Sequence, residues 1–381
     1  MRGIIVGGGI GGLTAALAFH RKGIEVEVYE RASRLAEVGA GVSLWPNALK
    51  ALHRLGLKSA LDDLSVVSDE GALRSADGRI LSRTSAQEFI RRFGFPATVF
   101  HRADLLDALV HAARTIPIHL GHECQRVEQD GDVVAAHFAN GAVARADFLV
   151  GADGLRSVVR DRIGTPAGLR YAGYTAWRGI VPFPRRDLIA GETFGCGRRF
   201  GVVPVIGNRV YWYATDNVAE GGRSTPAAAK EMLLGMFARW HQPIAAIVQA
   251  TDASSILRND IYDRDPVDTW GSGRVTLLGD AAHPMTPNLG QGACQAIEDA
   301  LVLARHVAAG DPPERALRRY ESERIPRTAS IVMASRRVGA LGQIQSPALC
   351  RVRDMVLGMV PLSISYRQLA PVIGYEGHLR D

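Results

Sequence analysis

An α/β fold is predicted for this chain of 381 residues: a three-layer, Rossmann-like nucleotide-binding domain, an inserted mixed β-sheet (α+β) domain and C-terminal helices. Three observations predict it. A glycine-rich turn follows the first apolar strand, two later apolar strands each end at an aspartate, and aromatic-rich strands lie between those two. With 47% hydrophobic and 22% charged residues, the chain can bury a large core, which fits two domains or one elaborated domain.

The first strand–turn–helix unit has the pattern of a dinucleotide-binding turn. Gly7, Gly9 and Gly12 form GxGxxG between an apolar strand and an amphipathic helix. Gly7 permits the tight turn, Gly9 lets the backbone approach a pyrophosphate, and Gly12 lets the helix pack on the strand, while the helix N-terminus attracts the anion. Glu30 ends the second strand, where it is placed to accept hydrogen bonds from an adenosine ribose. A glycine turn with a structural role only is the alternative.

Several elements follow before the second unit. A glycine-rich loop leads into a helix near Pro46, residues 66–98 indicate irregular strands, and residues 100–113 have helical periodicity. The pair Asn140-Gly141 between alternating strands predicts a β-hairpin. The second unit, FLVGADGLRSVVR, then brings Asp153 to the carboxyl end of a buried strand, where ligands of open parallel sheets collect. Capping of a helix that starts near Leu155 is an alternative role for Asp153, compatible with the first.

The third unit, VTLLGDAAHPMTPNLGQGACQAIEDA, brings Asp280 to another strand end, where a carboxylate can bind a polyol chain. Pro287 stiffens the following turn by fixing φ and removing a donor. Gly290 and Gly292 then let main-chain N–H groups come close to a flat ligand at the start of a helix over 293–307. Such a helix N-terminus favours adjacent negative charge by about 0.3–1 kcal/mol. The turn is therefore suited to a flat ligand that becomes anionic.

The remaining segments are assigned more coarsely. Residues 171–268 change to aromatic-rich strands with a helix from Pro226 to Trp240, and residues 311–345 are predicted to be helical. The apolar stretch 355–373 is interrupted by Arg367 and two prolines, so we expect a helix that packs on the body or on a second subunit, and no membrane span.

Charge and cysteine content narrow the class of protein. The formal charge of +6 is spread without a block of like charge, so nucleic-acid binding is not expected. The four cysteines lie far apart and form no CxxC, which argues against a disulfide framework or a metal site. Because the first apolar strand begins at Gly3, no room is left for a signal peptide, and we expect a cytoplasmic protein.

The three motifs GGGIGG…E, GADGLRSVVR and GDAAHPMTPNLGQGACQAIEDA together resemble those of single-component flavin-dependent monooxygenases of the para-hydroxybenzoate hydroxylase type. Within that family the chain looks most similar to urate hydroxylases, alkylquinolone hydroxylases and zeaxanthin-epoxidase-like bacterial enzymes. The resemblance implies FAD, NAD(P)H bound transiently without a second Rossmann fold, dioxygen, and a flavin C4a-hydroperoxide that hydroxylates an aromatic or heteroaromatic small molecule. It leaves open whether the protein is a monomer or a homodimer.

The resemblance and the residue patterns together give the candidate site. The candidate cofactor contacts are Gly7, Gly9, Gly11, Gly12, Glu30, Arg31, Ser43, Arg102, the backbone at Cys124, Asp153, Asp280, Gly290, Gln291 and Gly292. The candidate substrate contacts are Arg178, Arg199, Tyr211 and Tyr213, and the candidate catalytic residues are Arg199, Tyr211 and Pro287.

Alternatives remain for several of these residues. Arg102 can be a surface arginine that opens a helix, and the tyrosines can be packing residues of their strands. Arg178 departs from the asparagine that urate hydroxylases place there, which weakens the urate hypothesis. We expect His283 to be packed or bonded to its turn, and Trp45, Trp177 and Trp212 to be core or pocket wall.

The implied domains are discontinuous. Residues 1–70, 98–170 and 270–310 form the expected FAD-binding domain, residues 71–97 and 171–269 the substrate-binding sheet domain, and residues 311–381 a C-terminal helical segment. Alternative functions are an FAD-dependent epoxidase of an alkene, a non-oxygenating FAD oxidoreductase, and a flavin-binding sensor or carrier without turnover. A disulfide reductase is not expected, because one dinucleotide fingerprint is present and CxxC is absent.

Overall fold

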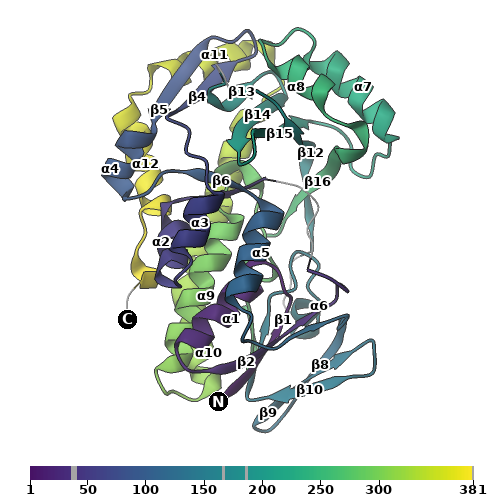
Figure 1. The fold of residues 1–381 in the computed structure, drawn as a ribbon, viewed down its shortest axis with the longest axis vertical. Helices are drawn as coiled ribbons and strands as arrows, with labels where there is room; N and C mark the ends of the chain where they lie inside the picture. Colours follow the sequence, from purple (N-terminus) through teal and green to yellow (C-terminus); the bar gives the residue numbers. More distant parts are fainter. Residues whose placement is uncertain (36–40, 165–167, 185–187, 380–381) are drawn as a thin grey trace.

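The computed structural model describes residues 1–35, 41–164, 168–184 and 188–379. The glycine-rich loop expected before Pro46 lies partly at 36–40, outside the described residues. Two sheet-based regions lie at opposite ends of the long axis of the molecule, and long helices run between them (Figure 1).

A five-stranded parallel sheet forms the lower region in Figure 1. The first and second units of the sequence supply neighbouring strands of this sheet. Their apolar side chains are buried on both faces, as is usual for parallel sheets. Helices α1 (Ile10–Arg21) and α9 (Gly292–Ala308) pack on one side, and a three-stranded antiparallel sheet lies on the other, which gives three layers (Figure 1). The strands in spatial order are β17 (Val275–Leu277), β11 (Phe148–Gly151), β1 (Arg2–Val6), β2 (Glu25–Glu30) and β7 (Ile118–Leu120).

The small antiparallel sheet contains the predicted hairpin. Strands β9 (Val133–Phe138) and β10 (Val143–Ala146) pair antiparallel, with β8 (Cys124–Asp130) beside β9. Asn140 Oδ1 accepts a hydrogen bond from the Ala142 amide at 3.0 Å, and Gly141 has φ +84°, so the Asn-Gly prediction is confirmed.

A mixed seven-stranded sheet forms the upper region (Figure 1). One of its faces is covered by α7 (Pro226–Phe237) and α8 (Ile244–Ala250), which bury Trp177, Phe200 and Trp212 in a core of their own. In spatial order its strands are β16 (Leu257–Asp263), β12 (Arg170–Pro182), β15 (Arg209–Asp216), β14 (Arg198–Val205), β13 (Ala190–Phe194), β4 (Glu70–Ser75) and β5 (Ile80–Ser85).

The prediction of irregular strands over 66–98 is wrong in its second half. Residues Ala86–Phe93 form helix α4, which buries Phe89 and Phe93 one turn apart and ends at Gly94 with φ +82°. Two aromatic residues at i and i+4 before a glycine form a short helix pattern. Strand β6 (Thr98–His101) follows and pairs with β3 (Gly41–Leu44).

The remaining helices connect or cover these sheets. The expected helix over 311–345 is a single long helix, and the apolar stretch 355–373 is divided between two helices broken at Val360-Pro361. No single helix in the described ranges is long and apolar enough to cross a membrane. These elements are α2 (Pro46–Arg54), α3 (Lys58–Leu64), α5 (Arg102–Ala112), α6 (Val158–Arg162), α10 (Pro313–Gly342), α11 (Pro347–Met359), α12 (Leu362–Ile373) and the 3₁₀ turns η1 (Ala253–Ser255), η2 (Gly279–Ala281), η3 (Pro287–Leu289) and η4 (Gly377–Leu379).

Candidate functional site

Three strand ends meet along one edge of the parallel sheet. Strands β1, β11 and β17 are adjacent and parallel, so the residues that follow them, Gly7, Asp153 and Asp280, lie at the same edge. The loops after β1 and β11 touch: a Cβ on Gly7, whose φ is +113°, would lie 2.3 Å from the Ala152 carbonyl oxygen. The chain passes from β1 to β2 on one side of β1, whereas the later strands β11 and β17 are added on its other side. This edge is therefore the topological switch point at which open α/β sheets bind ligands.

The glycine turn after β1 is built for close approach. A Cβ on Gly12 would lie 1.9 Å from the Gly7 carbonyl oxygen, so only glycine lets α1 start here. A Cβ on Gly9 would meet nothing within 4 Å, which leaves open space at the helix N-terminus for an anionic group. Glu30 accepts hydrogen bonds from the amides of Gly8 at 2.7 Å and Ala32 at 2.9 Å, so its carboxylate is held beside that turn.

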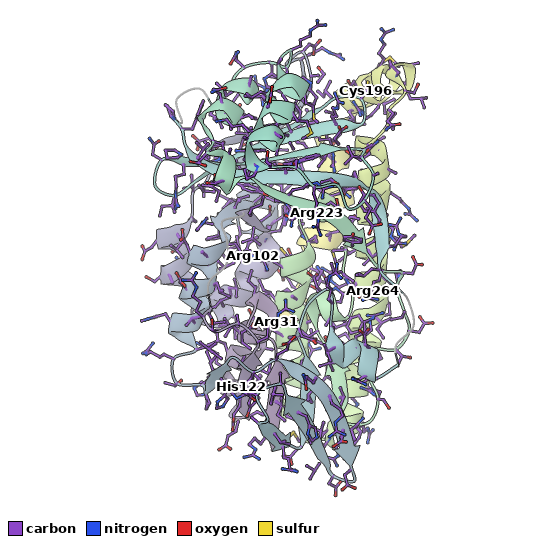
Figure 2. All side chains as sticks on the ribbon, turned by 90° about the vertical axis from the view of Figure 1, so that its right-hand side faces the viewer. Arg31, Arg102, His122, Cys196, Arg223 and Arg264 are labelled. Atoms are coloured by element: carbon purple, nitrogen blue, oxygen red, sulfur yellow. The ribbon has the colours of Figure 1, made fainter. Side chains whose placement is uncertain are left out.

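Asp280 and Arg102 lie close enough for their charges to act on each other. Burial raises the pKa of Asp280, whereas His283 and Arg102 act to lower it. Burial lowers the pKa of Arg102, whereas the negative charge of Asp280 acts to raise it. Yet both residues are exposed. Charged groups that are surrounded by protein and still reached by solvent lie in a hollow, which is where a polar ligand can pair with them. Figure 2 places Arg102 above Arg31, on the side of the seven-stranded sheet.

The turn after β17 packs tightly on strand β3. Gly290 has φ +61°, and a Cβ there would lie 2.9 Å from Trp45 Nε1 and 3.2 Å from Ser43 Cβ. Helix α9 begins at Gly292, where a Cβ would lie 3.9 Å from Asp280 Oδ1. The turn therefore brings together Ser43, Asp280 and the N-terminus of α9, which are all candidate cofactor contacts.

The side chains of two candidate cofactor residues, Asp153 and Cys124, are engaged or buried within the protein itself. The Asp153 carboxylate accepts hydrogen bonds from the Ser157 hydroxyl at 2.5 Å and from the Val158 amide at 2.8 Å, which is the capping alternative. Helix α6 begins at Val158, later than the start expected near Leu155. Cys124 is buried, and burial together with Asp153 raises the pKa of its thiol to about 11, so the thiol stays neutral.

The candidate substrate residues share one face of the seven-stranded sheet. Directly paired residues of neighbouring strands point to the same face, and Arg178 pairs with Tyr213, while Ile180 pairs with Tyr211. That face is opposite to the one under α7 and α8. A Cβ on Gly41 of β3 would lie 2.5 Å from the Tyr211 ring, so this face meets the elements around the cofactor turn. Burial raises the pKa of Tyr211, and Arg178 acts to lower it.

Arg199 lies on the same face but is fully engaged by protein groups. Its side chain is 3% exposed. Nη2 donates to Asn288 Oδ1 at 2.7 Å, Nε donates to Gln343 Oε1 at 3.0 Å, and Nη1 lies 3.2 Å from a Glu192 carboxylate oxygen. Arg199 thus ties the substrate sheet to the turn that holds Pro287, which is itself exposed. Glu192 and Gln343 belong to no sequence motif, and Asn288, although it lies within PNLGQG, was not singled out, because the three partners come from distant segments.

Behind the turn lies a buried ionic network that no sequence motif predicted. Arg324 donates to Glu298 at 2.6 Å and to Asp299 at 2.7 Å, and all three side chains are 0% exposed. Burial acts to raise the pKa of Asp299, but His283 and Arg324 lower it to about 2. His283 Nε2 lies 2.6 Å from Asp299, so His283 is packed, as expected. The adjacent acids Glu298 and Asp299, within the otherwise apolar helix after PNLGQG, were the feature of the sequence that could have indicated this network.

The network reaches the cofactor turn through buried amides. Asn47 Nδ2 donates to Glu298 at 2.6 Å and to Gln291 Oε1 at 3.1 Å. Gln291 is 0% exposed, and its Nε2 has no hydrogen-bond partner among the described residues. Gln291 thus connects the buried network to the first turn of α9.

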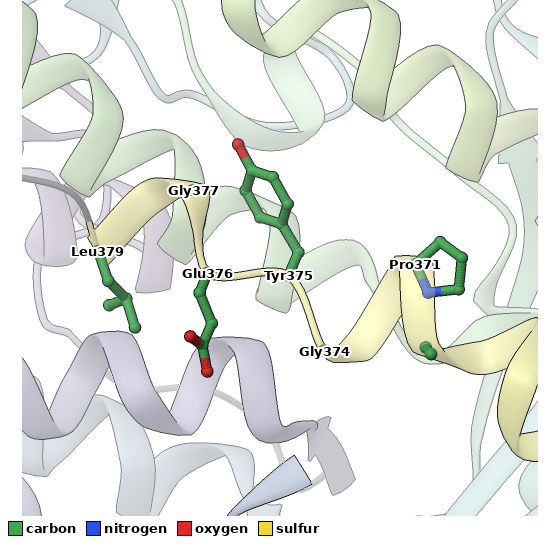
Figure 3. Close-up of a pocket in the computed structure, with 7 residues that line it drawn as sticks. Pro371, Gly374, Tyr375, Glu376, Gly377 and Leu379 are labelled. Carbon is green, nitrogen blue, oxygen red and sulfur yellow. The ribbon is translucent and has the colours of Figure 1, made fainter. Parts of the chain in front are cut away.

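A separate hollow lies elsewhere. It has a volume of about 610 Å³ and is lined by residues of the C-terminal segment around Tyr375 and Glu376 (Figure 3). None of its lining residues belongs to the candidate site. Within the described ranges, no group of three or more His, Cys, Asp or Glu residues is placed to hold a metal ion, and the four cysteines are free.

Fold and site together define a dinucleotide-binding protein whose crevice fits FAD. The space at Gly9 and the solvent-exposed Asp280 and Arg102 side chains are features that suit such a group. Residues 1–335 match the FAD binding domain family, and the chain belongs to that family.

Relatives narrow the class to flavin-dependent aromatic monooxygenases. The chain is 41% identical to the aurachin C monooxygenase/isomerase of Stigmatella aurantiaca over 94% of each protein. It is 39% identical to the 3-amino-4-hydroxybenzoate 2-monooxygenase of Streptomyces cremeus, over 92% of this chain and 90% of that protein. The crystal structure of Klebsiella pneumoniae HpxO with FAD and uric acid superposes with a TM-score of 0.92 at 30% identity, covering 98% of this chain and 96% of that one. The predicted fold class and the resemblance are thereby confirmed.

Proposed function

We propose that this flavoprotein uses NAD(P)H and O₂ to hydroxylate a flat aromatic or heteroaromatic small molecule. The substrate lies between the seven-stranded sheet and the turn over 287–292. FAD supplies the oxygen-transfer chemistry when bound, and the chain binds, orients and shields the substrate. The observation that carries the proposal is the shared face of Arg178, Tyr211 and Tyr213, which meets the cofactor turn through Gly41 and Arg199.

The charge of this face suits an acidic aromatic substrate. Arg178 is half-buried and donates to Asn259 Oδ1 at 3.3 Å, a long bond that a substrate oxyanion can replace. A guanidinium beside a phenol or a heteroaromatic hydroxyl favours the anion, and the anion makes the neighbouring ring carbon more nucleophilic. Tyr211 keeps its proton at neutral pH, because its pKa is raised, and can donate a hydrogen bond. Of the relatives named above, one is a 3-amino-4-hydroxybenzoate 2-monooxygenase and another binds uric acid in its crystal structure, and both of these compounds are flat and acidic.

The test is substrate-stimulated oxidation of NADH or NADPH by the FAD-loaded protein over aminohydroxybenzoates, quinolones and purines. Labelled dioxygen and product mass spectrometry complete it. The expected result is faster NAD(P)H oxidation with one compound class and one labelled oxygen atom in the product. An oxygenated alkene would establish the epoxidase instead, and a change of two hydrogens the non-oxygenating oxidoreductase. Bound FAD without stimulation by any compound would contradict all three and leave a carrier or sensor.

A further inference from the structure

Helix α11 is turned inside out relative to an ordinary surface helix. A surface helix normally buries its apolar stripe and exposes its polar face. In α11 the buried residues are Cys350, Arg353 and Asp354. The apolar side chains point to solvent within one stripe of the helix, with exposed fractions of 57% for Leu349, 51% for Val352, 54% for Met355, 50% for Val356 and 74% for Met359.

Specific contacts fix this orientation. The Arg353 guanidinium lies over the ring of Phe194, the last residue of the interior strand β13, at 5.0 Å, and it also pairs with Asp354 of its own helix at 2.8 Å. The Cys350 thiol donates to the Ile344 carbonyl at 3.2 Å. The helix cannot rotate to bury its apolar stripe without losing the contacts of Arg353 with Phe194 and of Cys350 with Ile344, so the stripe stays uncovered among the described residues.

The next helix extends the apolar surface. Tyr366 and Ile373 anchor α12 on Phe89 and Phe93, while Leu362 and Ile364 are 38% and 44% exposed. The two helices together have the apolar character of a membrane segment, but they are bent by 93° at the break between them. Helix α11 has 13 residues and spans about 20 Å, against a hydrocarbon thickness of about 30 Å. This geometry suits helices that lie in the plane of a membrane surface.

The charges around the stripe select the covering surface. Asp354 is the only carboxylate between 347 and 373, and it is buried and paired. The exposed charges of the two helices are Arg351 and Arg367, both positive. Anionic lipid headgroups attract arginines next to an apolar stripe. Two copies meeting by this surface would instead bring arginines of like charge together around a twofold axis.

We propose that α11 and α12 seat this protein on a membrane surface that carries anionic headgroups, with the apolar stripe at the boundary between headgroups and acyl chains. Figure 1 shows α11 at the end of the molecule that holds the substrate sheet, opposite to β9 and β10. Helix α11 follows closely on Gln343, which binds Arg199. If the proposed function holds, docking therefore brings the substrate sheet close to the membrane surface; the docking itself does not depend on that function.

The test is sedimentation of the FAD-loaded protein with vesicles of phosphatidylcholine, with and without phosphatidylglycerol. The wild type is expected to bind the mixed vesicles, and to bind less at high salt, because salt screens the arginines. Val352→Ser with Met359→Ser should lower binding about tenfold or more. Arg351→Gln with Arg367→Gln should lower it about fivefold per arginine, and only on mixed vesicles.

The control pair is Val133→Ser with Val143→Ser. These two valines are each 41% exposed on β9 and β10, at the opposite end of the molecule, and their replacement should leave binding unchanged. Equal FAD content and circular dichroism show that each variant is folded. Failure of the wild type to bind either vesicle overturns the proposal, as does an equal loss in the control. Light scattering measures the oligomeric state. A dimer that only the α11 variant dissociates, together with no binding to vesicles, would assign the surface to a second copy instead.

Discussion

Arg199 Nη2 donates a hydrogen bond to Asn288 Oδ1 at 2.7 Å, and this bond joins the substrate sheet to the turn that carries Gly290. Asn288 is held from its other side, since its Nδ2 donates to the Ser335 carbonyl at 3.0 Å. The position of the turn is therefore coupled to a side chain that is buried on the substrate face. Arg199 acts first as a positioning residue, and its direct contact with substrate stays a prediction.

Replacing Arg199 separates substrate turnover from cofactor binding. In Arg199→Leu the turn loses its link to the sheet, and Glu192 and Asn288 lose a buried partner. We expect substrate-stimulated NAD(P)H oxidation to fall about tenfold or more, the effect of a lost charged hydrogen bond, with FAD retained. Arg198→Leu is the matched control, because Arg198 lies on the opposite face and pairs with Asp216 near the surface. Equal losses in both variants would remove Arg199 from the site.

Asp280 is expected to retain FAD. Asp280→Ala removes a carboxylate whose charge acts on Arg102, and we expect the dissociation constant of FAD to rise about ten- to hundredfold. Equilibrium dialysis with the apoprotein measures it. Asp107→Ala, an exposed aspartate on α5, should bind FAD as the wild type does. An unchanged constant for Asp280→Ala would mean that the carboxylate has no contact with the cofactor.

Gly290 combines two constraints that a control can separate. Its φ of +61° disfavours any side chain, and a Cβ would press on Trp45 and Ser43. Gly290→Val should therefore abolish FAD binding, and Gly290→Ala should weaken it strongly. Gly310→Ala has the backbone strain alone, since Gly310 has φ +85° and nothing within 4 Å of its added Cβ. It should lose stability by about 1 kcal/mol and keep its flavin. Yellow Gly290→Val protein with normal occupancy would contradict this placement.

The buried network predicts a large loss of stability. Glu298→Gln removes the negative charge that pairs with Arg324 and Arg327, and both Glu298 and Arg324 are fully buried. Breaking such a pair costs about 3–5 kcal/mol in the free energy of unfolding. Glu128→Gln breaks a surface pair with Arg126, whose side chain is about half exposed, and should cost under about 1 kcal/mol. Urea denaturation of both variants checks the difference, and equal costs would show that the network is not stabilising.

His378 gives the fold a dependence on pH. It is 2% exposed, and burial lowers its pKa to about 4, although Glu298 acts in the opposite direction and Arg324 and Arg327 add to the decrease. The unfolded chain therefore binds a proton at higher pH than the folded one. Its contribution to stability is present above the unfolded pKa of about 6.5 and is lost as pH falls toward 4, by about 2–3 kcal/mol. Denaturation of the wild type and His378→Gln at pH 7, 5.5 and 4.5 tests this: the variant should lose less stability over that range.

The sequence predicted the parts of the site that a local pattern determines. A strand, a turn and a helix in succession place Gly7, Asp153 and Asp280 whatever the rest of the chain does, because parallel strands end at one edge. The partners of Arg199 were beyond reach, since Asn288 and Gln343 meet it only through the packing of η3 and α10 on β14. Only the C-terminal part of the α11 stripe lies in the predicted apolar stretch 355–373, and composition does not show whether an apolar face is covered.

Strand β17 joins the parallel sheet beside β11, although β11 and β1 are made far earlier along the chain. A ribosome must therefore release the chain beyond Gly292 before the third strand end and the N-terminus of α9 can close the crevice. Shorter nascent chains have the glycine turn but lack Asp280 and the N-terminus of α9. We therefore expect FAD capture to be a late step of biosynthesis.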